Sequence, residues 1–286
     1  MHVTDSGWTW AWPWWGTIVA LNVLQVIVGV AGFARSRREA SPGDAGYARI
    51  MRTMGLIFVL VACYRSIFVS SYLRQLAWFD SPLNGSLLIR CFAFCAELSF
   101  AGLIAKTQLR IDADLPELTS GYSRTAPRIL FASILIANLF ATSATITKVG
   151  LLFALEETCW GIGFVAILPL LILRARQLPG FPGAGQLRTA NLLSLIFTAG
   201  YCVFQLGINL PVVQWPEALA QLHMAQPDPP YRFGFAAIRD AFLVVHQTKD
   251  LAAWGGMGFV VWHSGYFTVC VWLVLYLMRG PRLRRA

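Results

Sequence analysis

Residues 149–174 read VGLLFALEETCWGIGFVAILPLLILR, and this stretch decides the fold. The hydrocarbon core of a bilayer is about 30 Å thick, and a helix needs about 20 mainly apolar residues to cross it. The stretch has that length, and the only charges in its interior are those of Glu156 and Glu157. It therefore predicts a transmembrane helix that carries two adjacent carboxylates.

Six further apolar stretches of the 286-residue chain have a similar length. The composition agrees, because 57% of the residues are hydrophobic and 13% are charged, against about 25% charged in soluble domains. We expect an all-α, polytopic membrane protein, a seven-transmembrane-helix bundle that forms one integral membrane domain over residues 1–286. The predicted spans are 12–34, 50–73, 85–107, 127–147, 149–174, 189–212 and 254–278.

The distribution of basic residues predicts how the bundle faces the membrane. Cytoplasmic loops collect Lys and Arg, and seven crossings place sixteen of the 23 basic residues at one end and five at the other. We therefore expect an extracytoplasmic N-terminus and a cytoplasmic C-terminus in a bacterial inner (plasma) membrane. Because these residues flank apolar runs and do not form a solvated basic face, no nucleic-acid partner is expected.

Several ionisable residues fall inside the predicted spans, where they are costly and usually functional. Arg90 and Glu97 are two helical turns apart on one face. Glu156 and Glu157 point about 100° apart, so one can reach an arginine while the other faces a cavity. We predict that residues in the outer half of four spans meet in one polar cavity. These residues are Arg65, Arg90, Glu97, Glu156, Glu157 and His263.

The sixth span carries a polar stripe at helical spacing, formed by Ser194, Thr198, Tyr201, Gln205 and Asn209. Such a stripe often serves interhelical hydrogen bonding. Next to charged residues, it can also line a substrate site. The expected substrate-binding residues are Arg65, Arg90, Trp160, Gln205, Asn209 and Tyr266.

The segment 233–253, before the last span, alternates apolar and charged residues and predicts an amphipathic external helix. In such a helix His246 and Asp250 share a face. Imidazole and carboxylate groups suit Zn or non-haem Fe. The predicted metal ligands are His246, Asp250, His263 and Glu157.

These residues favour an intramembrane enzyme that acts on a lipid-like or apolar substrate, as a hydrolase or an oxidoreductase, with or without a metal. Buried carboxylates beside a histidine suit general acid–base chemistry, and arginines suit an anionic headgroup. A structural ion-pair network is the plain alternative for the same side chains. The predicted catalytic residues are Glu97, Glu156, Glu157 and His263.

Two other classes of function stay open at this point. Polar residues inside the spans also suit a transporter, a channel or a proton-coupled carrier. The topology also matches a seven-helix receptor or a non-catalytic subunit of a membrane complex, although a retinal pigment is not expected because residues 255–278 contain no lysine for a Schiff base. The expected partners are membrane lipid, a lipid-like small molecule or another subunit of a membrane complex.

Overall fold

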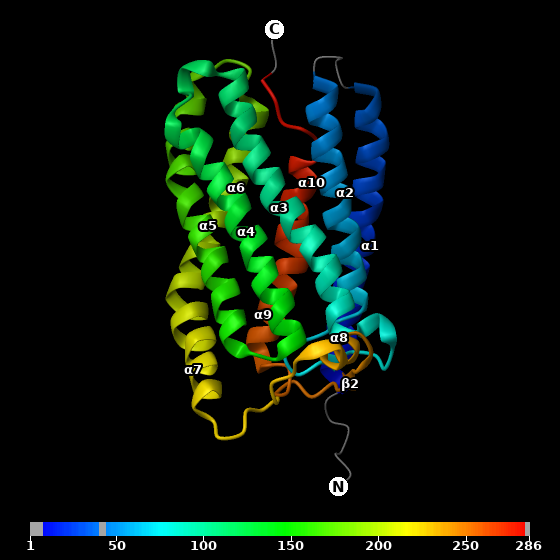
Figure 1. Cartoon of the computed structure of the whole chain (residues 1–286). Coiled ribbons are helices and arrows are strands. Elements are labelled where there is room, and N and C mark those ends of the chain that lie inside the picture. The colour runs from blue at the N-terminus through cyan, green and yellow to red at the C-terminus, as the bar shows by residue number, and fades with distance from the viewer. Residues whose placement is uncertain (1–7, 40–43, 284–286) are drawn as a thin grey trace.

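The computed structural model describes residues 8–39 and 44–283. It is 80% helical, and seven of its helices are long and apolar enough to cross a membrane. The helices run side by side along one axis, with the two termini at opposite ends (Figure 1). We call these the N-terminal end and the C-terminal end. The predicted all-α polytopic bundle is confirmed.

The long helices follow one another up and down the bundle. They are α1 (Trp8–Glu39), α2 (Ala45–Ile67), α3 (Ser86–Asp114), α4 (Gly121–Thr147), α5 (Gly150–Gln177) and α6 (Gly185–Phe204). The sixth span continues through a π-helical segment, η5 (Gln205–Gln214), into α7 (Trp215–His223). The last span consists of α9 (Gly256–Gly265), the π-helical η6 (Tyr266–Cys270) and α10 (Val271–Leu277).

Short elements join these helices. They are η2 (Pro82–Asn84), η3 (Pro116–Leu118), η4 (Leu178–Gly180), α8 (Gly234–Leu243) and the strands β1 (Leu76–Ala77) and β2 (His246–Gln247). The strands pair in parallel, with Leu76 opposite His246. This pairing ties two distant loops together at the N-terminal end.

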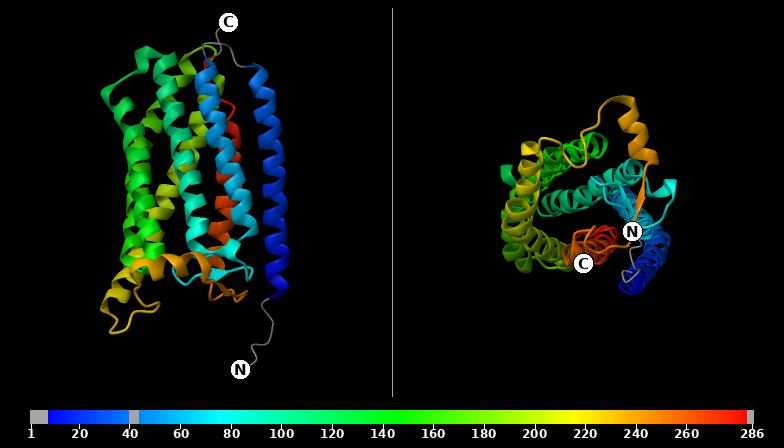
Figure 2. Two further views of the ribbon diagram at one scale, coloured as in Figure 1. Left: turned by 45° about the vertical axis from the view of Figure 1, so that its right-hand side comes forward. Right: turned by 90° about the horizontal axis from the view of Figure 1, so that it is seen from below.

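Sequence neighbours from α1 to α6 pack against each other in turn, and α10 contacts α1, α2, α3 and α6. The view along the bundle axis shows this arrangement (Figure 2). Gly55 permits one of these contacts, because a Cβ atom there would lie 2.3 Å from the Cβ of Met278. Small residues at such positions let helix backbones approach closely in membrane bundles.

Two amides of α1 bind the π-helical part of the last span. The side chain of Asn22 donates to the carbonyl of Phe267 at 3.2 Å, and that of Gln25 donates to the carbonyl of Thr268 at 3.4 Å. Both amides are fully buried. These hydrogen bonds hold α1 against η6, which carries part of the site described below.

The predicted external helix over 233–253 is wrong in its second half, because α8 ends at Leu243. The side chain of Gln75 donates to the carbonyls of Asp240 and Val244 at 2.8 and 3.2 Å. The Asp240 carbonyl also accepts from the backbone of Val244, whereas the Val244 carbonyl, which a longer helix would have used internally, accepts from Gln75 instead. His246 then enters β2, so His246 and Asp250 do not share a helix face.

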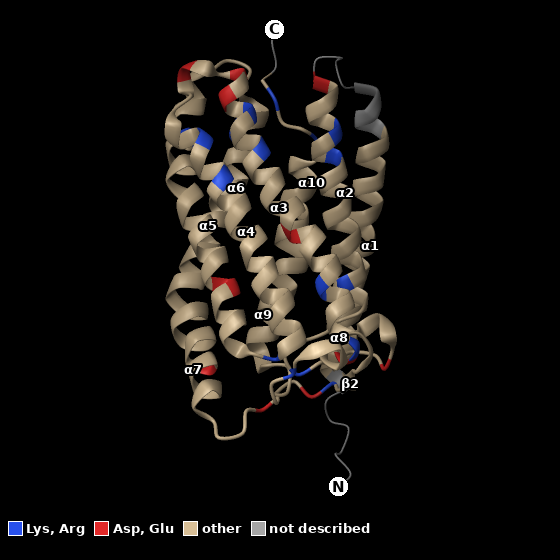
Figure 3. Ribbon diagram, viewed as in Figure 1, with Lys and Arg blue, Asp and Glu red and all other residues tan. Residues whose placement is uncertain are grey.

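Several span boundaries also differ from the prediction. The second span is Ala45–Ile67 and not 50–73, the third runs to Asp114 and not to residue 107, and the fourth begins at Gly121 and not at residue 127. Arg52 lies buried within the second span, with its guanidinium 6.0 Å from the Phe33 ring centre. The sixth span runs to His223 and not to residue 212. Most charged residues nevertheless gather at the two ends of the bundle, with few along its middle (Figure 3).

Candidate functional site

Arg90 lies at the centre of a buried group of polar side chains. On α3, its Nη2 atom is 2.5 Å from Oε2 of Glu97, two turns along the same face. Its Nη1 atom is 3.3 Å from Oε1 of Glu156 on α5. The Nη2 atom also donates to the side-chain oxygen of Asn138 on α4. The Arg90 side chain is 2% exposed. Three helices are therefore joined through one guanidinium.

Arg65 of α2 occupies a more open position beside this group. Its guanidinium donates to the hydroxyls of Tyr72 at 2.9 Å and Tyr266 at 3.4 Å, and it lies 5.2 Å from the Tyr266 ring centre. Oε1 of Glu97 is 3.8 Å away, and the Arg65 side chain is 16% exposed. Arg65 therefore has mainly neutral partners, whereas Arg90 has two carboxylates.

Glu157 differs from its neighbour Glu156 in the groups that bind it. Its Oε2 atom accepts hydrogen bonds from the side-chain amides of Gln205 at 2.9 Å and Asn209 at 3.2 Å. Tyr201 also lies near this carboxylate. The π-helical η5 presents both amides, and Gln214 extends this row by donating to Asn209 at 3.3 Å. Glu157 is thus a carboxylate held by neutral donors.

His263 lies in an aromatic box on the side of the last span that faces α1. Its ring centre is 5.1 Å from that of Trp14, 5.0 Å from Phe259 and 4.3 Å from Phe267. Its Nε2 atom is buried and has no hydrogen-bond partner among the described residues. Arg65 interacts with it electrostatically. The imidazole therefore belongs to the same region but does not contact the carboxylates.

An aromatic layer lies beneath the polar group, toward the C-terminal end. Phe197 packs against Phe100 and Phe164 with ring centres 5.0 and 5.7 Å apart, and Tyr201 packs on Phe164 at 4.7 Å. We call Phe100, Phe164 and Phe197 the aromatic floor. Trp160, a predicted substrate-binding residue, stacks on Phe164 at 5.7 Å and is largely buried.

The four predicted metal ligands do not form one set. His246 pairs with β1 through its backbone, and its side chain is exposed. Asp250 accepts a hydrogen bond from the backbone of Ala252 at 3.1 Å in the following turn. Over residues 8–39 and 44–283, no group of three or more His, Cys, Asp or Glu side chains is positioned to hold a metal ion.

Three residues of this region were missed in the sequence. The sequence could have indicated that Asn138 belongs to the polar group, because it is an amide in the middle of an apolar span. No sequence pattern marks Tyr72 as part of this region, since its position depends on the fold of the loop after α2. No role is predicted from the sequence for Lys148, whose Nζ atom donates to the carbonyl of Tyr72 at 2.8 Å.

Lys148 is the most buried lysine that the structure describes, with 1% of its surface exposed against 5% for Lys249. Burial, and to a smaller extent the nearby charge of Arg232, lowers the pKa of Lys148 to about 7. It also has a left-handed backbone conformation, with φ of 63°, in the tight turn between α4 and α5. Through Tyr72, this lysine is linked to Arg65.

The structure thus brings together five of the six predicted ionisable residues, from α2, α3 and α5, and places His263 beside them. The polar group holds three carboxylates and two guanidiniums. Arg90 joins Glu97 and Glu156 in one hydrogen-bonding network, and the adjacent Glu157 belongs to a second network with Gln205. No protein-family model, curated protein or solved structure matches the chain.

Proposed function

We propose that the chain is an intramembrane enzyme that acts on a lipid-like substrate with an anionic group. In this proposal Arg65 binds the anion and Glu157 transfers a proton. The supporting observation is that Glu157 takes part in none of the ion pairs among the described residues, since Glu97 and Glu156 pair with Arg90 while amides hold Glu157.

Arg65 suits an anion because its positive charge is only weakly paired. A guanidinium has five N–H donors, and the described contacts use two of them on tyrosine hydroxyls. The carboxylate of Glu97, at 3.8 Å, is beyond ordinary hydrogen-bond length. A phosphate or carboxylate of a substrate can therefore bind beside Tyr72 and Tyr266.

Glu157 suits a general base because its orientation is fixed while part of its side chain stays accessible. The two amide donors leave Oε1 for a substrate or a water molecule. A catalytic base must come within hydrogen-bond reach of the proton that it removes. In this scheme Glu97 and Glu156 are positioning residues, because they hold Arg90. His263 is also a positioning residue, because it acts only through Arg65.

The aromatic floor favours an enzyme over a carrier or channel. Transport requires a path along the whole bundle, and Phe100, Phe164 and Phe197 pack against one another directly below the polar group. An enzyme needs access from one side only. We place that side at the extracytoplasmic leaflet, as the basic residues at the opposite end suggest.

Purified protein incubated with a total lipid extract from its host membrane tests this proposal. Mass spectrometry should detect a lipid that is consumed and a product that accumulates. E157Q should reduce the rate at least about 100-fold, as expected for the loss of a general base. E217Q, which alters an exposed glutamate of α7, should have no effect. Unchanged lipids with the wild-type protein, or full activity in folded E157Q, would refute the proposal.

A further inference from the structure

Two small cavities meet at Arg279, at the opposite end of the bundle from the polar group. One, of about 40 Å³, is lined by Val28, Gly32, Leu275 and Met278 together with Arg279. The other, of about 60 Å³, is lined by Gln186, Tyr276, Pro281 and the same arginine. A cleft whose other side chains are apolar, here called the apolar cleft, and a second cleft that includes Gln186 and Tyr276 therefore share one cationic side chain.

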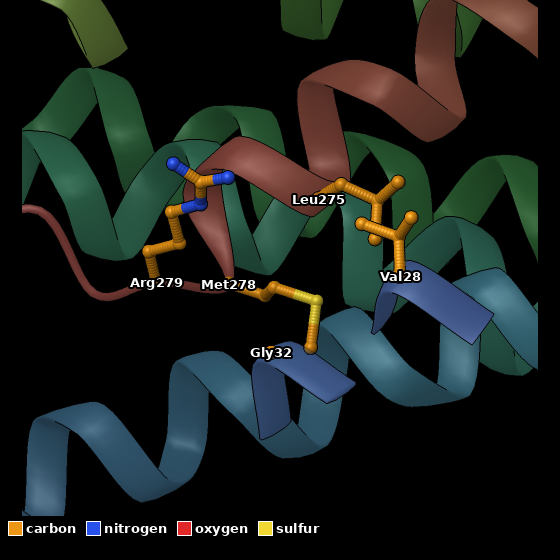
Figure 4. A pocket seen from close by; sticks show the side chains of 5 residues that line it. All are labelled: Val28, Gly32, Leu275, Met278 and Arg279. Carbon is orange, nitrogen blue, oxygen red and sulfur yellow. The ribbon is translucent and has the colours of Figure 1, made fainter. Parts of the chain in front are cut away.

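The apolar cleft forms where α1 and α10 separate. The helices touch at Gly29, where a Cβ atom would lie 3.3 Å from Leu275. One turn further on, a Cβ atom at Gly32 would meet nothing within 4 Å. In Figure 4, Val28 and Leu275 face each other across this cleft, and the side chain of Met278 reaches toward Gly32.

The cleft opens onto the surface of α1, the least buried of the seven spans, with 22% of its most apolar window buried. Ile27 and Val30 on this helix are 60% and 49% exposed. Such a surface faces acyl chains if the helix crosses a bilayer. An acyl chain can therefore enter the cleft from the side.

Arg279 is available to an anion, unlike its neighbours. Arg110 and Arg282 both pair with Asp44, at 2.8 and 3.3 Å. The exposed guanidinium of Arg279 instead lies over the ring of Tyr276 at 5.9 Å. Among the residues that the structure describes, no carboxylate lies within 4.0 Å of it.

We propose that Arg279 and the α1–α10 cleft bind one anionic phospholipid, with an acyl chain along Gly32 and the phosphate on the guanidinium. A guanidinium can bind a phosphate through two parallel hydrogen bonds. The second cavity places the polar groups of Gln186 and Tyr276 beside the rest of the headgroup. Basic pockets between helices at this level are typical of phospholipid headgroup sites.

Thermal unfolding in lipid nanodiscs tests this site without any assumption about catalysis. Phosphatidylcholine nanodiscs are compared with nanodiscs that also contain phosphatidylglycerol, and native mass spectrometry counts the bound lipids. Phosphatidylglycerol should raise the Tm of the wild-type protein. R279Q should weaken phosphatidylglycerol binding about fivefold, as expected for one interfacial arginine. G32L should weaken it as well, by filling the cleft.

Matched controls separate this site from general effects. R188Q removes another exposed arginine at the same end, and G16L places leucine at another α1 glycine whose Cβ position is open. Both should bind phosphatidylglycerol like the wild type, and circular dichroism should show that all variants are folded. Equal losses in R188Q and R279Q, an unchanged response in R279Q, or the same stabilisation by inorganic phosphate alone would overturn the proposal.

Discussion

Arginine–carboxylate groups occur at two levels of the bundle, and their construction differs. The central cluster consists of Arg65, Arg90, Glu97, Glu156 and Glu157. The end cluster, at the C-terminal end, consists of Asp44, Asp112, Asp114, Arg110 and Arg174.

In the end cluster each carboxylate has a cation and a second donor. Asp112 binds Arg174 and accepts from the hydroxyl of Ser123 at 2.6 Å. Asp114 binds Arg110 at 2.8 Å and accepts from the backbone of Leu283 at 2.9 Å. These contacts hold helix ends and the C-terminal segment in place. Every carboxylate of the end cluster is paired with a cation.

The central cluster has one carboxylate more than its ion pairs use. Glu157 is held by Gln205 and Asn209, and the guanidinium of Arg65 is directed mainly to hydroxyls. The difference teaches that the two clusters differ in pairing: the end cluster pairs every carboxylate with a cation, whereas the central cluster holds one carboxylate through neutral donors. The proposed function rests on this difference.

Removal of the central guanidinium should have the largest effect on stability. R90M leaves Glu97 and Glu156 buried without their cation, so the free energy of unfolding should fall by about 3–5 kcal/mol. Thermal unfolding in detergent measures the loss. The triple variant R90M/E97Q/E156Q should recover most of it, because the uncompensated charges are gone. An R90M protein as stable as the wild type would mean that the cluster contributes no net pairing energy.

The next effect concerns Lys148, whose ammonium form is disfavoured in the fold. With a pKa of about 7 in the folded state against 10.5 when unfolded, the lysine is charged in both states below pH 7. Stability should therefore rise from pH 7 to pH 10.5, by at most about 4–5 kcal/mol. Unfolding measured at several pH values should show this slope.

Two variants isolate the contribution of this lysine from that of other groups that titrate in the same range. K148M should lose the part of the slope due to Lys148. K106M, which changes an exposed lysine at the other end, should keep it. The same slope in K148M and the wild type would assign the pH dependence to other groups.

Within the end cluster, R174M should cost about 2 kcal/mol, because Asp112 loses one charged hydrogen bond but keeps Ser123. The cost should be smaller than that of R90M, since one carboxylate is affected and not two. Denaturant titration of both variants under one condition compares them. A larger loss of stability in R174M than in R90M would contradict the prediction that the central cluster contributes more to stability than the end cluster.

The surplus carboxylate should contribute little to stability. In E157Q the side-chain oxygen can still accept from Gln205 and Asn209, so the free energy of unfolding should change by less than about 1 kcal/mol. The same experiment on E97Q, which removes a charge from Arg90, should give a larger loss. Equal losses of stability in E157Q and E97Q would mean that Glu157 is a structural residue like Glu97.

The smallest effect on stability is expected for an exposed ion pair, which serves as the reference value for both buried clusters. Arg239 pairs with Asp240 at 3.2 Å on the surface of α8, and its side chain is 64% exposed. R239A should therefore change stability by about 0.5 kcal/mol or less. Thermal unfolding at low and high salt measures this value, and a loss above that of R174M would contradict it.

The spans and the central cluster could largely be predicted from helical geometry. Apolar runs locate each helix, and the seven-residue spacing of Arg90 and Glu97 places them on one face. The angle between Glu156 and Glu157 predicts that only one of them reaches an arginine, as the structure confirms. These features depend on local periodicity, which the sequence contains.

The rest depends on contacts between distant segments. Tyr72 lies in a loop whose position is fixed by Lys148 and by pairing of β1 with β2. The end of α8 is set by Gln75, which is remote in sequence from this helix. The predicted pair of His246 and Asp250 failed for that reason, because helical spacing cannot reveal a competing hydrogen-bond donor elsewhere.

The sixth span is long enough for one end to project beyond the membrane, where a label can report which side that end faces. Its 39 residues from Gly185 to His223 would extend up to roughly 58 Å as an α-helix, nearly twice the thickness of the hydrocarbon core. Even with some tilt, α7 should stand clear of the lipid. An epitope inserted after the exposed Gln226 would then be bound by antibody on spheroplasts if this end faces outward, and an epitope that stays unbound until the membrane is permeabilised would assign this end to the cytoplasm.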